Sequence, residues 1–176
     1  MSEGSDFLSF MGSLDDTLLR VLVQSSTNSM LSEQPHEISV GNFFCEMYRR
    51  FPDQISVFFE NPERFKSIAD KLAPRSLPID LLSDRKALAE RMTLRREALQ
   101  KATIVGDWSL PDKEGGTPAL DVRLSSSLGR LFRRTAALAI EAEHHRADMH
   151  DLVKALSMDE ALAGELREET GLILKK

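Results

Sequence analysis

Apolar residues recur every three to four positions along most of the chain, which predicts a series of amphipathic helices. Leu18, Val21 and Leu22 stand at i, i+3 and i+4, and Phe43 and Met47 show the same spacing in the next stretch. No stretch alternates between apolar and polar residues for long enough to indicate a strand. The pattern therefore predicts an all-α fold.

Residues that cap helices stand where these patterns begin. Asp15, Ser39 and Asp148 each precede an apolar stretch, and their side chains can accept hydrogen bonds from the free amides of a first helical turn. Asn61 is followed by Pro62, a pair typical of the N-cap and the first helical position. These positions predict where four of the helices start.

The changes in composition along the chain predict four parts within one compact domain. They are an apolar N-terminal segment, a first helical block, a connector and a second helical block, at residues 1–13, 14–73, 74–121 and 122–176. The connector contains a predicted amphipathic helix at about residues 83–102 and a loop rich in Gly and Pro at 105–121.

The predicted connector helix is basic, with six bases against three acids in residues 84–101. The simplest interpretation is that this basic face is exposed to water. It could alternatively dock on an acidic surface of the same assembly, and residues 141–169 carry nine acids against three bases. Binding to nucleic acid is a third alternative, but the helix lacks aromatic residues that would stack on bases.

Composition limits the class of protein. The chain of 176 residues is 41% hydrophobic, enough for a core, and its net charge of −5 argues against nucleic acid or an anionic membrane as the main partner. Cys45 is the single cysteine, so an intrachain disulfide is excluded and a reducing compartment is expected. The N-terminus has acids where a secretory signal has bases, and no apolar run is long enough to span a membrane. We expect a soluble cytoplasmic protein.

The two helical blocks match each other in sequence. Leu14 corresponds to Leu124 with a shift of 110 residues, and Ser39 corresponds to Asp148 with a shift of 109. The matching also places a loop histidine and several apolar positions in register. Two unrelated amphipathic helix pairs can be aligned in part by chance, but the joint agreement favours a duplicated unit in which two copies share one core.

The repeated unit resembles the Clp repeat, two copies of which form the N-terminal domain of the Clp AAA+ unfoldases. In the second block the matching residues are AALAIEAEHHRADMHDLVKAL followed by ELREETGLIL, and in the first they are PHEISVGNFFCEM followed by FKSIADKLAP. The resemblance covers about two thirds of the chain and implies two pseudo-twofold-related helical repeats with an inserted helix and loop.

Within this family the chain is most similar to the ClpV branch, which belongs to type VI secretion systems. The resemblance lies in the apolar segment Phe7-Leu8-Ser9-Phe10-Met11 and in the run TPALDVRLSSSL that enters the second block. The connector is longer than this branch leads us to expect.

The resemblance implies that the chain binds protein segments and has no catalytic activity or cofactor of its own. It lacks the GxxxxGK[ST] motif that cradles nucleotide phosphates. We expect the recognition domain of a Clp or ClpV-like unfoldase, which acts beside a AAA+ hexamer in cis or in trans. The alternatives are a free-standing Clp adaptor and a helical nucleic-acid-binding regulator.

The phenylalanines predict where a partner binds. Six of nine lie in residues 43–65, more than the short helices there can easily bury. We therefore predict a groove for an amphipathic helix of a partner. Its predicted lining residues are Phe7, Phe10, Phe51, Phe58 and Phe59.

Other candidate chemistry has simpler explanations. His144, His145, Asp148, His150 and Asp151 are metal-ligating residue types, but their spacing is not that of a known metal motif, so no metal site is expected. Cys45 stands beside Phe44 on a predicted helix and is expected to be a buried structural thiol. No spacing of Ser, His and Asp indicates a catalytic nucleophile.

Overall fold

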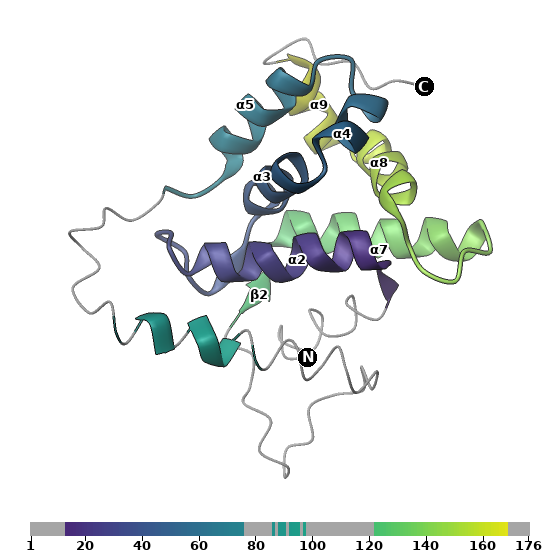
Figure 1. The fold of residues 1–176 in the computed structure, drawn as a ribbon. Helices are drawn as coiled ribbons and strands as arrows, with labels where there is room; N and C mark the ends of the chain where they lie inside the picture. Colours follow the sequence, from purple (N-terminus) through teal and green to yellow (C-terminus); the bar gives the residue numbers. More distant parts are fainter. Residues whose placement is uncertain are drawn as a thin grey trace.

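The structure is a computed structural model that describes residues 13–75, 86, 88–90, 92–95, 97 and 122–168. It is mostly helical (Figure 1), as the apolar periodicity predicts. The prediction of an all-α fold is nevertheless wrong in one respect, because β1 (Glu37–Ile38) and β2 (Arg123–Leu124) form a small parallel sheet. Each strand has two residues, which is too short to show alternation in the sequence.

The first block forms four helices, with N-terminal caps at the predicted positions. The Asp15 side chain accepts from the amide of Leu18 at 2.9 Å, and Ser39 forms a capping box with Asn42. Asn61 accepts from the amide of Arg64 at 3.3 Å. The helices are α2 (Asp16–Ser29), α3 (Val40–Arg50), α4 (Pro52–Phe58) and α5 (Pro62–Leu72).

In its described residues, 122–168, the second block forms three helices, which begin in the same way. Ser125 and Asp159 accept from the amides of Leu128 and Leu162, and Asp148 forms a capping box with Asp151. These bonds satisfy amides that a helix start leaves without an intrahelical partner. The helices are α7 (Ser126–Glu141), α8 (Met149–Met158) and α9 (Glu160–Glu168).

Backbone pairing joins the two blocks at two places. In the sheet, Ile38 pairs with Leu124, and the amide of Ser125 donates to the Ile38 carbonyl at 2.9 Å. In an isolated parallel bridge, Leu14 pairs with Ala147, and the amide of Asp15 donates to the Ala147 carbonyl at 2.8 Å. In both places the residue before the N-cap of the first helix of one block pairs with the residue before the N-cap of the second helix of the other.

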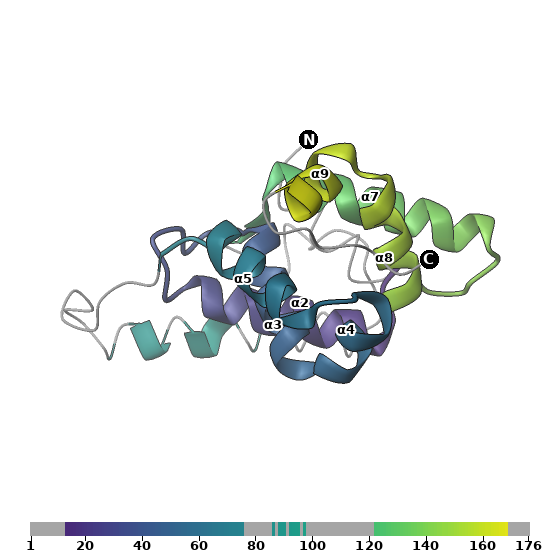
Figure 2. The same ribbon diagram turned by 90° about the horizontal axis from the view of Figure 1, so that it is seen from above.

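Buried side chains from both blocks form a single core. The blocks lie on opposite sides in Figure 2, with α2 to α5 on one side and α7 to α9 on the other. Between them, the rings of Phe43 and Phe132 meet edge to face, with centroids 5.1 Å apart. Inside the first block, the rings of Phe44 and Phe59 both pack on Phe65.

Gly41 allows the close approach of two helices. It lies in the first turn of α3, where a Cβ atom would come within 2.1 Å of the Ala73 nitrogen and 2.2 Å of the Leu72 carbonyl carbon. Both are backbone atoms at the end of α5. The contact between α3 and α5 therefore requires a residue without a side chain.

The described part of the connector agrees with the predicted basic helix. Residues 86, 88–90, 92–95 and 97 are helical, and all of them lie within the predicted 83–102. The predicted N-terminal segment, apart from its last residue, and the predicted loop at 105–121 lie outside the described residues. Among the described residues no helix is both long and apolar enough to cross a membrane.

Candidate functional site

The structure places the predicted groove residues in different environments. Phe7 and Phe10 lie outside the described residues. Phe59 is fully buried, with its ring centroid 4.6 Å from that of Phe65, so the prediction that it lines a groove is wrong. Phe51 and Phe58 are half-buried against the core and could still contact a partner.

Phe58 lies where the first block meets α8. Its ring centroid is 6.1 Å from that of His150, and α4 lies beside α8 in Figures 1 and 2. Pro52 starts α4, and Ile55 is its fully buried residue, so Val57 projects away from the core with 64% of its surface exposed. We call Val57, Phe58 and His150 the α4–α8 surface.

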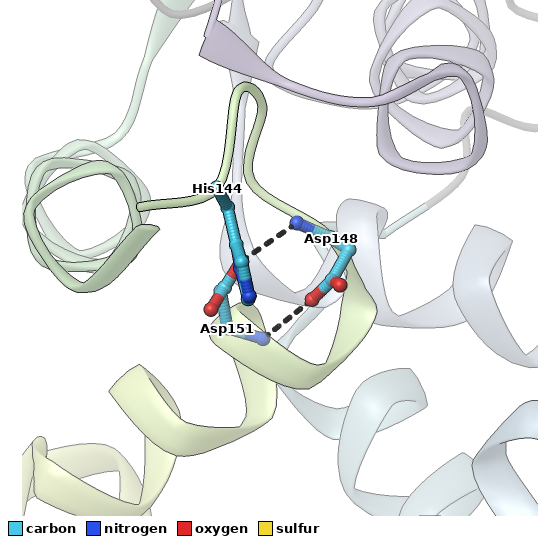
Figure 3. Close-up of side chains that lie close together, drawn as sticks. All are labelled: His144, Asp148 and Asp151. Carbon is cyan, nitrogen blue, oxygen red and sulfur yellow. Dashed lines mark hydrogen bonds and ion pairs between the residues drawn. The ribbon is translucent and has the colours of Figure 1, made fainter. Parts of the chain in front are cut away.

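A histidine and two aspartates meet at the start of α8 (Figure 3). The amide of Asp148 donates to the Asp151 carboxylate at 3.1 Å, and the amide of Asp151 donates to the Asp148 carboxylate at 2.9 Å. His144 Nδ1 lies 2.8 Å from the same Asp151 oxygen. The cluster therefore ties the loop between α7 and α8 to the first turn of α8.

The charges in this cluster stabilise one another. The hydrogen bond with Asp151 and its negative charge raise the pKa of His144. Burial acts to raise the pKa of Asp151, but hydrogen bonds from His144 and from the backbone outweigh it and lower that pKa.

The same cluster could in principle coordinate a cation, because the three residues each offer a ligand atom within 4.8 Å of the others. Both carboxylates, however, accept amide hydrogen bonds at a helix N-terminus, where the helix dipole favours negative charge. Helix capping therefore explains this arrangement without a metal.

We expect the stabilising effect of His144 to depend on pH. Because its pKa is raised above 6.5 on folding, its stabilisation is complete below pH 6.5 and disappears as the pH rises through the folded-state pKa. The variant His144→Gln should therefore melt below wild type in mildly acidic buffer, with a difference that shrinks towards alkaline pH. Thermal melts across this range measure it.

The control for this experiment is His145→Gln, which alters an exposed residue of the same loop. If His144→Gln lowers the melting temperature equally at every pH, protonated His144 does not stabilise the fold through Asp151.

Cys45 has the properties of a structural thiol. It is half-buried, and its Sγ lies 3.5 Å from a carboxylate oxygen of Asp70. Burial and the charge of Asp70 raise the pKa of the thiol to about 12. The thiol therefore stays protonated at neutral pH, which disfavours nucleophilic chemistry.

The role of Arg95 was not predicted from the sequence. Arg95 was expected among the bases of an exposed helix face, whereas its side chain is buried against the end of α2. The sequence contains one signal for this contact. Residues 25–32 are mostly hydroxyl residues, and such a helix end, if buried, requires a polar partner.

No protein-family model, curated protein or solved structure is significantly similar to this chain.

Proposed function

We propose that this chain is a non-catalytic protein-recognition domain of the Clp N-terminal type, built from two copies of a helical unit. It would bind an amphipathic segment of a partner at the α4–α8 surface. The observation that carries this proposal is the exchanged backbone pairing between the two blocks.

The alignment of the two helical blocks in sequence relates the two backbone pairs to each other. It aligns Leu14 with Leu124 and Ile38 with Ala147. The pairs found are Ile38 with Leu124 and Leu14 with Ala147. The second pair is thus the first with the two copies exchanged, as expected for two units related by a pseudo-twofold axis.

Matched polar contacts also support the duplication. The capping boxes at Ser39 and Asp148 occupy aligned positions. Ser25 and Thr135, which align with a shift of 110, are both fully buried and both donate to the carbonyl four residues earlier. Amphipathic periodicity does not require aligned buried hydroxyls, so this match supports a duplicated unit.

The chemistry of the α4–α8 surface supports the proposed recognition of a protein segment. It combines an exposed aliphatic side chain, Val57, with the half-buried ring of Phe58 and the exposed imidazole of His150. Exposed apolar side chains beside aromatic rings are typical of surfaces that receive the apolar face of a helix.

We expect substitutions on this surface to weaken peptide binding by about tenfold or more, because a central apolar contact contributes about 1–3 kcal/mol. The probe is a labelled amphipathic helix with leucines at i, i+3, i+4 and i+7 and no net charge. Fluorescence anisotropy compares the binding of this probe by wild type, Val57→Asp and Phe58→Ala. Because Val57 is exposed, we expect its substitution to leave the fold intact.

The matched control is Leu94→Ala, because Leu94 is 58% exposed and lies on the separate segment 86–97. It should bind the probe as wild type does. If the two surface variants bind as tightly as this control, the α4–α8 surface is not the binding site.

Two arrangements are consistent with this function, namely the recognition domain of a Clp or ClpV-like unfoldase and a free-standing adaptor. The reading frame of the gene distinguishes them, because an unfoldase requires a Walker A motif. If the domain is repeated around a hexameric ring, simultaneous binding strengthens contacts that are weak individually.

A further inference from the structure

Arg95 fills a polar socket at the end of α2. Only 4% of its surface is exposed. Its guanidinium donates from Nη1 to the Ser26 carbonyl at 2.8 Å and to Ser29 Oγ at 3.4 Å, and from Nη2 to the Pro35 carbonyl at 3.0 Å.

The α2 end suits a guanidinium. The partial negative charge at a helix C-terminus favours a cation, and carbonyl oxygens at several angles match the forked donors of arginine. A lysine has a single ammonium and could not reach these acceptors with the same planar geometry.

The socket is held together by α2 and the turn that follows it. Ser29 Oγ donates to the Ser26 carbonyl at 2.8 Å, and Ser32 Oγ donates to the Ser29 carbonyl at 2.7 Å. Both hydroxyls belong to buried residues. Neither of these two bonds involves residues 86–97, so the end of α2 has hydrogen bonds of its own besides those to Arg95.

The described residues around Arg95 are less buried than Arg95 itself. Among the described side chains of residues 86–97, Arg95 is the one that is fully buried, whereas Leu94 is 58% exposed and Leu88 and Met92 are half-buried. A helix that covers a core normally buries an apolar stripe. Among the described residues of this segment, the fully buried contact with the first block is instead made by a charged side chain.

From these contacts we propose that the α2 socket is a binding site for an arginine side chain on a helical segment of a partner protein. Residues 86–97 occupy the socket in cis and compete with that partner. This site is separate from the α4–α8 surface, so either proposal can fail without the other.

The test uses the full chain with Arg95→Ala, which empties the socket, and Lys86→Ala as the control on an exposed base of the same segment. The first probe is a labelled peptide with the sequence of residues 84–102, and the second replaces its Arg95 by neutral citrulline. The third is an alanine-rich helix of unrelated sequence with one arginine.

We expect the arginine peptide to bind Arg95→Ala at least about tenfold more tightly than wild type or Lys86→Ala, because the chain no longer competes for the socket. The citrulline peptide should bind Arg95→Ala about tenfold or more weakly than the arginine peptide does, because it lacks the hydrogen bonds from a charged donor. The unrelated helix should also bind Arg95→Ala more tightly than wild type.

Three outcomes would overturn this proposal. The first is equal binding of the arginine and citrulline peptides. The second is binding of the chain's own segment but not of the unrelated helix, which would make the contact an internal latch. The third is unfolding of both Arg95→Ala and the longer Arg95→Met by circular dichroism, which would make Arg95 a structural residue.

Discussion

The variant Gly41→Ala should lose about 3 kcal/mol or more of its free energy of unfolding. The added Cβ would lie 2.1 Å from the Ala73 nitrogen, far inside van der Waals contact. The obstructing atoms belong to the backbone at the end of α5, and the Ala73 amide is held by a hydrogen bond to the Ala69 carbonyl. Rotation of a side chain cannot relieve the clash, so α3 and α5 must separate.

Urea denaturation followed by circular dichroism measures this loss. The matched control is Gly129→Ala, because Gly129 is also inside a helix but its added Cβ would meet only the flexible Arg133 guanidinium, at 3.8 Å. Alanine is a better helix former than glycine, so this control should gain up to about 1 kcal/mol. Equal effects of the two substitutions would contradict the close approach of α3 and α5.

The second large effect is expected for Phe132→Ala, at about 4 kcal/mol. Phe132 is fully buried on α7, and its ring packs edge to face on Phe43 of α3. Truncation leaves a cavity between the two blocks and removes an aromatic contact. Because the blocks share one core, we expect both to unfold in a single transition at lower denaturant concentration.

Two further variants show whether lost volume causes this effect. Phe132→Leu keeps most of the volume and should cost markedly less than the alanine variant. Ile140→Ala truncates an apolar residue of the same helix that is 75% exposed, and it should change stability by less than about 0.5 kcal/mol. Two separate unfolding transitions in Phe132→Ala would indicate that the blocks do not depend on one another.

Local features of the sequence were sufficient to predict the helix starts. Each N-cap side chain binds the amide three residues later, so a cap can be recognised from the residues next to it. This holds for Asp15, Ser39, Asn61 and Asp148. The apolar face of Leu18, Val21 and Leu22 was also predicted correctly, and all three residues are fully buried.

Features that depend on distant residues could not be predicted. The pairing of Ile38 with Leu124 joins parts of the chain that have no local signal for each other. Phe59 was expected at the surface. It is buried because its ring packs on Phe65, which also contacts Phe44 of α3, a helix that comes earlier in the chain. The Arg95 socket joins residues 60 to 69 positions apart, and counting bases on a helix does not reveal it.

The exchanged pairing between the blocks also makes the chain suited to domain swapping. The bonds that join Leu14 to Ala147 and Ile38 to Leu124 use only the backbone, and both connect one block with the other. The first block of one molecule can therefore form the same bonds with the second block of its neighbour, provided that the connector extends between them. Refolding at high protein concentration favours such intertwined dimers, in which the backbone bonds between a first and a second block are kept.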